Sequence, residues 1–165
     1  MKGPQQLYER LAVLGIGFDY HEHPPAPTIE EAMKYWKDIN ATHCKNLFFR
    51  NHKGNQHYLV ILEHHNALNI HELELKLKQG KLSFASDQRM MKYLGVTPGS
   101  VTPLALIHDT EHHVHVFLDA RLQDAGKISF HPCINTASLV LNYNDFLKFL
   151  GWTQNSWEYI SISDL

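Results

Sequence analysis

The sequence predicts an α+β protein with a mixed, mostly antiparallel sheet surrounded by helices. Apolar runs of strand length alternate irregularly with helical patterns along the chain. Several consecutive runs are separated only by short turns, which favours antiparallel or mixed pairing over a doubly wound parallel sheet. The chain has 165 residues, a common size for one core, so we expect residues 1–165 to form a single domain.

Two helices around a short strand are expected in the N-terminal part. Leucines recur at helical spacing within residues 4–14, and glycines follow that stretch. Residues 18–21 have the composition of a short strand. Thr28 and Glu31 have the spacing of a capping box, which predicts a second helix over residues 28–37.

A hairpin and two helices are expected in the middle of the chain. Residues 45–50 and 57–62 are apolar runs joined by the turn sequence His52-Lys-Gly-Asn55. A helix capped by its first residue is expected over 69–79. A shorter helix over 87–94 would end at a glycine.

The C-terminal part is expected to consist of strands followed by one helix. The helix would begin at Asn142 or Asn144 and extend to Leu150. An aromatic tail containing Trp152 and Trp157 would then cover the core or dock a partner. The expected strands are residues 104–108, 113–118, 127–131 and 137–142.

Composition restricts the classes of partner and the compartment. The net charge of −2 is not that of a protein with a broad basic face for DNA, although a small phosphate-binding patch is compatible with it. The N-terminus lacks the apolar core of a signal peptide, and no apolar run has membrane-spanning length. Cys44 and Cys133 are the only cysteines, which is no disulfide framework, so we expect a cytoplasmic protein.

The run Gly95-Val-Thr-Pro-Gly-Ser-Val-Thr-Pro103 is the most unusual segment. Its prolines fix φ, and its glycines allow positive φ or close approach of the backbone. Such a rigid loop can form the wall of a ligand site. A tight connection between a helix and a strand explains the run equally well.

Neither a nucleophile nor a metal site stands out. No Gly-x-Ser-x-Gly elbow accompanies the serines. Cys133 and His131 would share a strand face, but a buried thiol is the more common outcome. The 13 histidines include the local clusters His21/His23, His64/His65 and His112/His113/His115. They lack the ligand spacing of a zinc site, so no metal is expected.

Five segments in order resemble the YbaK/ProX family of aminoacyl-tRNA editing domains, in particular the free-standing prolyl-tRNA deacylases. These segments are Tyr20-His-Glu-His-Pro24, Lys45-Asn46, Leu82-Ser-Phe-Ala-Ser-Asp87, Gly99-Ser-Val-Thr-Pro103, and His131-Pro132 with Asn135-Thr-Ala137. Taken alone, Lys45 is an ordinary strand-end lysine. The resemblance implies a mixed sheet curled into a partly open barrel, and no metal or other cofactor.

The resemblance also implies an activity and assigns residues to it. The family hydrolyses the ester between an amino acid and the terminal adenosine of tRNA, with the substrate's own ribose hydroxyl thought to take part. Lys45 would position the phosphate or the ester, and His131 would bind substrate or orient water. The expected partner is the acceptor end of proline tRNA, and prolyl-tRNA synthetase is a second candidate. The positions assigned to substrate binding are Asn46, Gly99, Ser100, Val101, Thr102, Pro103, Asn135 and Tyr20.

The amino acid that is removed is a finer question. The loop and the Tyr20–Pro25 segment look most like the branch that removes alanine from proline tRNA, and related branches remove cysteine, serine or threonine. The chain departs from the family pattern at Pro27, where an aromatic residue is more usual. Two other classes stay open: a catalytically inactive binding module for tRNA or a synthetase, and a small ester or thioester hydrolase using Cys133 and His131.

Overall fold

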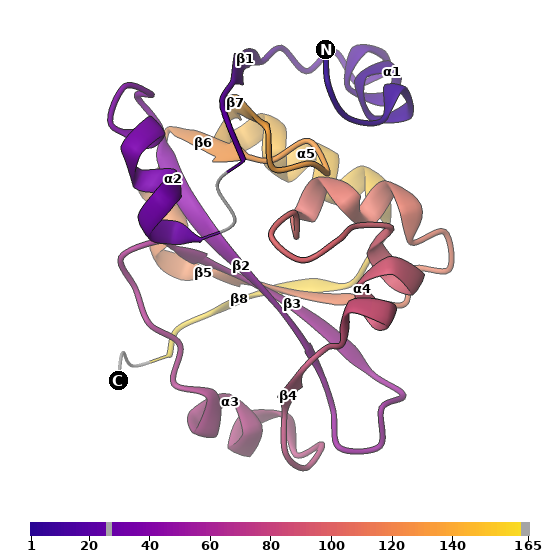
Figure 1. Cartoon of the computed structure of the whole chain (residues 1–165). Helices are drawn as coiled ribbons and strands as arrows, with labels where there is room; N and C mark the ends of the chain where they lie inside the picture. Colours follow the sequence, from indigo (N-terminus) through magenta and orange to yellow (C-terminus); the bar gives the residue numbers. More distant parts are fainter. Residues whose placement is uncertain (26–27, 163–165) are drawn as a thin grey trace.

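The structure is a computed structural model that describes residues 1–25 and 28–162, and Pro27 lies outside these residues. It is an α+β fold in which helices surround one mixed sheet (Figure 1). The elements in chain order are α1 (Gln5–Val13), β1 (Asp19–Glu22), α2 (Ile29–Trp36), β2 (Thr42–Arg50), β3 (His57–Glu63), α3 (Ile70–Leu77), β4 (Ser83–Phe84), α4 (Asp87–Leu94), the 3-10 helix η1 (Pro103–His108), β5 (His115–Asp119), the 3-10 helix η2 (Ala120–Asp124), β6 (Lys127–Phe130), β7 (Ala137–Asn142), α5 (Tyr143–Thr153) and β8 (Trp157–Ile160).

The sheet has the strand order β1-β7-β6-β2-β3-β5-β8, and β4 pairs separately with β2. The pairs β1–β7, β6–β7, β2–β3 and β2–β4 are antiparallel, whereas β2–β6, β3–β5 and β5–β8 are parallel. Across the described residues the sheet has two end strands, β1 and β8, and does not close into a barrel. The predicted mixed, open arrangement is therefore confirmed.

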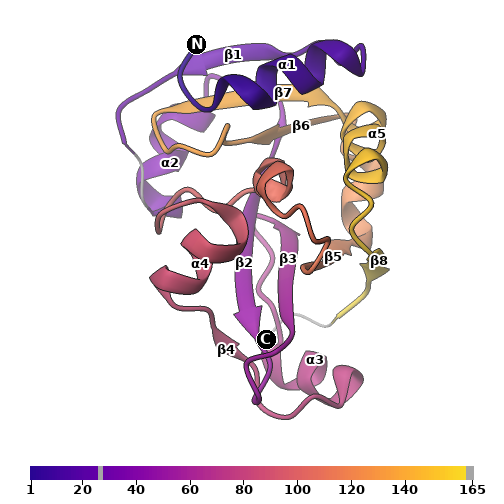
Figure 2. The same cartoon turned by 90° about the vertical axis from the view of Figure 1, so that its right-hand side faces the viewer.

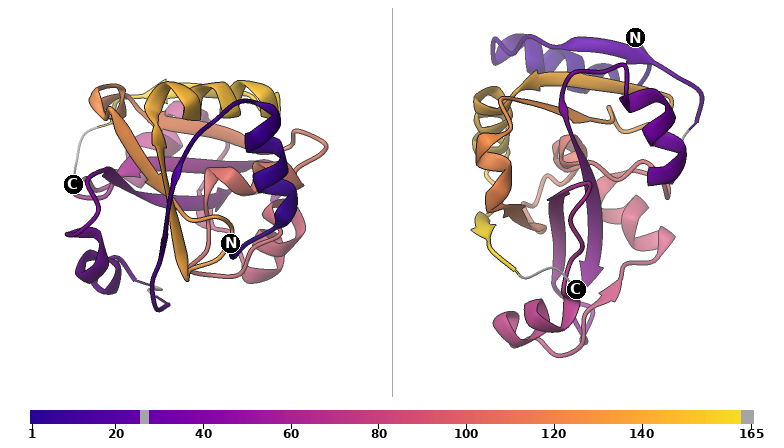
Figure 3. Two further views of the ribbon diagram at one scale, coloured as in Figure 1. Left: turned by 90° about the horizontal axis from the view of Figure 1, so that it is seen from above. Right: turned by 90° about the vertical axis from the view of Figure 1, so that its left-hand side faces the viewer.

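The long strand β2 joins two parts of the sheet that run in different directions. Figure 2 shows β1, β7 and β6 crossing the top of the molecule while β2 and β3 run downward beneath them. Figure 3 shows α2 and α4 on the same side of β2. Helices α2 and α4, which are far apart in the sequence, therefore face the same side of β2.

The main core fills the space between the two parts of the sheet, α1, α5 and η1. It includes the fully buried side chains Leu7, Phe48, Leu104 and Phe146. A smaller cluster around Phe49 packs on the other face of β2, beneath α3. None of the helices among the described residues is long and apolar enough to cross a membrane.

Local sequence signals account for the helix starts. The N–H of Glu31 donates to Thr28 Oγ1 at 3.2 Å and begins α2, as the capping-box spacing predicts. The N–H of Glu72 donates to Asn69 Oδ1 at 3.1 Å and begins α3. Gly95, with a φ of 65°, ends α4 in the left-handed conformation.

One predicted strand of the C-terminal half was wrong. Residues 104–108 form the 3-10 helix η1 instead of a strand, because Pro103 fixes the first φ and Thr102 Oγ1 accepts the N–H of Leu104 at 3.3 Å. Every residue from Pro103 to Ile107 is buried, so the run has no periodicity that distinguishes helix from strand.

Part of the aromatic tail forms a strand that was not predicted, β8, on the edge of β5. Asn155 holds it in place by donating from Nδ2 to Asp109 Oδ2 and to the carbonyl of Val114, both at 2.8 Å. Trp157 and Tyr159 pack against the main core, in agreement with the expectation that the tail covers the core.

Candidate active site

One edge of β2 is open in its middle. On that edge β6 pairs with Thr42 and His43, and β4 pairs with Phe49 and Arg50. Residues 44–48 between these two ladders belong to neither of them, whereas the opposite edge pairs with β3 along its length. An interior strand therefore presents a short stretch of unpaired edge, which is otherwise a feature of the outer strands of a sheet.

The open edge presents backbone groups of Asn46. The carbonyl of His43 accepts the N–H of His64 on the β3 side, and the carbonyl of Phe48 accepts the N–H of Ala85 on the other side, both at 2.9 Å. In an antiparallel strand the N–H and C=O groups of successive residues alternate between the two edges. The N–H and C=O of Asn46 consequently point to the open edge, where a ligand can bind them.

A cavity of about 300 Å³ lies over this edge. Its walls come from four separate parts of the chain: α2, β2, the β4–α4 region with the loop after it, and the end of β6. Five of the residues expected from the sequence line it, namely Lys45, Asn46, Gly99, Val101 and His131. The fold thus gathers residues that are distant in the sequence around one concave site.

The glycine- and proline-rich loop forms one wall through a type II turn. The N–H of Ser100 donates to the carbonyl of Thr97 at 3.1 Å, with Pro98 and Gly99 at the two central positions. Gly99 has a φ of 87°, and a type II turn requires positive φ at its third residue. Pro98 fixes its own φ, Gly99 permits the positive φ, and the hydrogen bond closes the turn, so the loop is restricted where it forms this wall.

Asn46 connects the loop to β2. Its Nδ2 donates to the carbonyl of Val101 at 3.2 Å. Its Oδ1 is buried and has no hydrogen-bond partner among the described residues. Because an unpaired buried acceptor is costly, this oxygen is a place where a substrate donor or a water molecule would gain a hydrogen bond.

Lys45 brings a positive charge to the cavity. It is half-buried, and no carboxylate in the described part of the chain lies within ion-pair distance of its ammonium. A cation without a protein partner beside a concave site is available to a negatively charged ligand.

His131 is held in one tautomer at the end of β6. Its Nδ1 donates to the carbonyl of Ala137 at 2.9 Å, which leaves Nε2 as an acceptor. Burial lowers the pKa of His131 below its ordinary value of 6.5. The neutral ring can therefore accept a hydrogen bond from a water molecule or a hydroxyl at neutral pH.

The ring of a second histidine, His23, lies beside that of His131. The rings of His23 and His131 lie 5.9 Å apart, and the ring of His23 stacks on that of Tyr35 at 5.5 Å. His23 Nδ1 donates to the carbonyl of Pro24, and its Nε2 accepts from Ser138 Oγ, both at 2.9 Å. These contacts connect α2 to β7 and to His131, which directly follows β6.

The wall formed by α2 is a part of the site that sequence reasoning missed. Ile29, Ala32 and Trp36 lie on one face of this helix and line the cavity. Their spacing of three and four residues was the available signal, but it does not distinguish a site wall from a core face. Phe84 on β4 and Met90 on α4 line the other side. Neither was assigned to the site, although Phe84 lies in the motif segment Leu82–Asp87.

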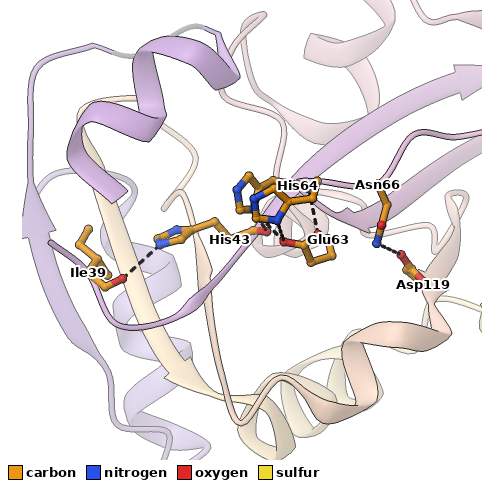
Figure 4. Close-up of polar contacts among 7 residues, drawn as sticks. Ile39, His43, Glu63, His64, Asn66 and Asp119 are labelled. Atoms are coloured by element: carbon orange, nitrogen blue, oxygen red, sulfur yellow. Dashed lines mark hydrogen bonds and ion pairs between the residues drawn. The ribbon is translucent and has the colours of Figure 1, made fainter. Parts of the chain in front are cut away.

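A group of histidines lies next to Trp36. The ring of Trp36 stacks on that of His43 at 4.5 Å and meets that of His64 edge-on at 5.0 Å. Figure 4 shows His43 donating to the carbonyl of Ile39, and Glu63 beside His64. Burial lowers the pKa of His43 to about 4, so its ring is neutral beside the indole.

Glu63 connects two of these histidines. Glu63 Oε1 lies 2.9 Å from His64 Nδ1 and 2.8 Å from His65 Nδ1. The ligand atoms of the three residues lie within 4.8 Å of one another, close enough to share a divalent ion. The absence of a metal from this protein therefore stays a prediction.

The other expected binding residues lie outside the cavity lining. Ser100 and Thr102 are buried residues of the loop itself, where they close the turn and cap η1, and Pro103 is buried beside them. Asn135 lies in the turn between β6 and β7. Tyr20 accepts the N–H of Lys2 at 2.7 Å and donates to Glu22 at 2.8 Å, on β1.

The two cysteines are poor candidates for a nucleophile. Burial raises the pKa of Cys133 to about 12 and that of Cys44 well above its ordinary value. The reactive thiolate is therefore scarce at neutral pH. Cys44 lines the cavity beside Lys45, whereas Cys133 is not among the described residues that line it.

Comparisons with known proteins agree with this site. The family model of the aminoacyl-tRNA editing domain matches residues 23–149. The chain is 35% identical over 162 residues to the prolyl-tRNA editing protein ProX of Acetoanaerobium sticklandii, covering 98% of this chain and 99% of that one. It is 36% identical over 152 residues to the prolyl-tRNA synthetase associated domain-containing protein 1 of Mus musculus, covering 90% and 89%.

Solved structures show the same fold. A protein proposed to be a trans-editing enzyme for prolyl tRNA synthetase superposes with a TM-score of 0.76 over 100% of both chains, at 20% sequence identity. The matched family model spans every residue that lines the cavity. This chain therefore belongs to the aminoacyl-tRNA editing domain family.

Proposed function

We propose that the protein is a trans-editing hydrolase that removes alanine from mischarged proline tRNA by hydrolysing the ester at the terminal adenosine. One observation carries this proposal: the cavity brings Lys45, Asn46, Gly99, Val101 and His131 together over an open strand edge. Membership of the editing family supports the reaction class, and the names of the ProX relative and of the structural neighbour support proline tRNA as the substrate.

Lys45 supplies the charge in this proposal. Its ammonium attracts the terminal phosphate of the tRNA or the oxyanion that develops as the ester is attacked. Removing one such donor from a hydrolase typically costs about 3–4 kcal/mol of transition-state stabilisation. No described carboxylate competes for Lys45, which favours this role.

Asn46 and His131 position the reacting groups. The backbone N–H of Asn46 on the open edge can donate to the ester carbonyl, and the free Nε2 of His131 can accept from a water molecule or a ribose hydroxyl. An aminoacyl ester is already activated. Holding the ester, the water and the vicinal hydroxyl in place is therefore sufficient to explain catalysis without a protein nucleophile.

Alanine is the amino acid that this proposal assigns to the cavity. Trp36, Phe48 and the type II turn at Gly99 give it large and rigid walls, and a rigid wall excludes a larger ring by overpacking. One or two atoms change binding by only about 1–3 kcal/mol. Cysteine, serine and threonine are accordingly the competing substrates within the same mechanism.

Recognition of the tRNA is expected to involve few phosphates. The net charge of −2 leaves only small basic patches, so binding to the acceptor end should depend weakly on salt. Prolyl-tRNA synthetase is the partner proposed to supply the mischarged tRNA, and the cytoplasm is the proposed compartment.

Deacylation of proline tRNA charged separately with alanine, cysteine, serine and proline tests the proposal. Release of alanine with prolyl-tRNA spared is the expected result. Release of cysteine or serine instead would keep the reaction and change the substrate. No release above the spontaneous rate from any of the four would contradict the hydrolase and leave a binding module.

A further inference from the structure

Phe84 is a large apolar side chain that is exposed at the cavity. The residue is 60% exposed and is one of the residues that line the same cavity as Lys45. A single exposed apolar residue on a protein surface is ordinary. An exposed aromatic ring at the rim of a candidate tRNA site has a specific chemical use, because every nucleobase has a face that can stack on it.

The backbone on both sides of Phe84 is fixed. Phe84 pairs with Phe49 in the β2–β4 ladder, and the N–H of Ala85 donates to the carbonyl of Phe48 at 2.9 Å. Ser86 then caps α4 by accepting the N–H of Arg89 at 3.2 Å. Phe84 therefore lies between a paired strand and a capped helix start. Because its backbone is held in place, little conformational entropy is lost when a ligand stacks on the ring.

One face of the ring is already supported. The rings of Phe84 and Phe49 stack with centroids 4.6 Å apart and planes at 25°, and Phe49 is fully buried. The exposed surface of Phe84 is thus available to a flat partner. Such a partner would continue the stack by one ring.

The position of Phe84 suits the base of the same nucleotide that carries the ester. Phe49, its pairing partner, lies four residues after Lys45 on β2, a distance of about 13 Å along a strand. Lys45 and Phe84 consequently lie toward opposite ends of one cavity. A nucleoside that carries an aminoacyl ester can extend from one to the other.

We propose that Phe84 is the stacking platform for the terminal nucleobase of the aminoacyl-tRNA, the adenine next to the ester that is hydrolysed. This inference rests on the proposed function and adds the contact that recognises the nucleoside part of the substrate. Stacking does not read the hydrogen-bonding edge of a base. Phe84 therefore contributes binding of a base without selecting its identity.

The test uses two small esters and a substitution that keeps apolar volume. Alanyl adenosine carries the base, and alanyl methyl riboside keeps the ester and the vicinal hydroxyl without a base. We expect Phe84→Leu to raise KM for alanyl adenosine about 5- to 150-fold at unchanged kcat, and to leave the riboside unaffected. Phe84→Tyr, which keeps an aromatic ring, should have the wild-type KM for alanyl adenosine. Leu75→Ala is the matched control, because Leu75 is 65% exposed on α3 and does not line the cavity.

Binding of adenosine 5′-monophosphate separates this inference from the proposed function. Upfield shifts of its adenine protons with the wild type, lost in Phe84→Leu, would support the platform even if neither ester were hydrolysed. Hydrolysis of both esters with equal effects of Phe84→Leu on each, or adenine shifts that persist in Phe84→Leu, would overturn the platform and leave the hydrolase standing.

Discussion

Replacing Gly99 by alanine tests the type II turn that forms one wall of the cavity. Gly99 has a φ of 87°, in the region that residues with a Cβ adopt at a cost. Gly17 is a matched control within the same chain. Its φ is not positive, and a Cβ added there would meet nothing within 4 Å.

The comparison of Gly99→Ala with Gly17→Ala sets a Cβ at a positive φ against a Cβ at an ordinary φ. Both substitutions reduce the freedom of the unfolded chain, a stabilisation of about 0.4–1 kcal/mol that cancels in the comparison. The strain of the left-handed conformation is about 1–2 kcal/mol for a residue with a Cβ. At about 2–4 °C per kcal/mol for a chain of this size, Gly99→Ala should melt about 2–8 °C below Gly17→Ala.

Thermal unfolding and deacylation assays check this expectation together. A displacement of the loop by about 1 Å can reduce the rate of a positioned reaction by about 10²-fold, so Gly99→Ala should also lose activity while Gly17→Ala keeps it. Equal melting temperatures for the two variants would refute the left-handed turn. Lower stability of Gly99→Ala at full activity would refute the role of the loop as a wall of the site.

Three further outcomes are expected. Cys133→Ala should keep full deacylase activity. Labelling of Cys133 by iodoacetamide should be slow at pH 7.5, because burial raises the pKa of this thiol to about 12. Fast labelling that also abolishes activity would contradict this. His57 has its pKa lowered from 6.5 to about 4, by burial first. The unfolded chain therefore binds a proton that the folded chain does not as pH falls through this interval, and stability should decrease there. Urea unfolding at pH 7 and pH 4.5 measures the decrease, and His57→Gln should show less of it; an equal decrease in both proteins would count against the assignment. Asn155→Ala should lower the free energy of unfolding by about 1–3 kcal/mol, because Asp109 and the carbonyl of Val114 lose a buried donor. An unchanged urea midpoint would show that these bonds do not stabilise β8.

Most of the fold was predictable because its local signals agree with the tertiary structure. Thr28 and Asn69 cap the helices that their spacing indicates. The failure at residues 104–108 has a physical reason: a fully buried run is apolar in every position, so only the cap at Thr102 separates a 3-10 helix from a strand. Strand β8 is short and pairs with a strand distant in the sequence, which no local pattern reveals.

The site was predictable only in part, for a different reason. Lys45, Asn46, Gly99, Val101 and His131 were expected because they belong to motifs of a known family, and the fold places all five around one cavity. Residue type and spacing alone did not identify the α2 wall, and Phe84 was not assigned to the site although it lies in the motif segment Leu82–Asp87. Those residues have ordinary patterns of buried helix faces and exposed aromatics, and only their position across the open edge of β2 gives them a role.

Single-turnover deacylation of alanyl-tRNA by Lys45→Ala tests the central claim most directly. Lys53→Ala is the matched control, because Lys53 is an exposed lysine on the β2–β3 turn outside the cavity. We expect Lys45→Ala to lose about 10²–10³ in rate, with wild-type thermal stability, and Lys53→Ala to be unaffected. A Lys45→Ala variant that deacylates alanyl-tRNA at the wild-type rate would contradict the assignment of this cavity as the active site.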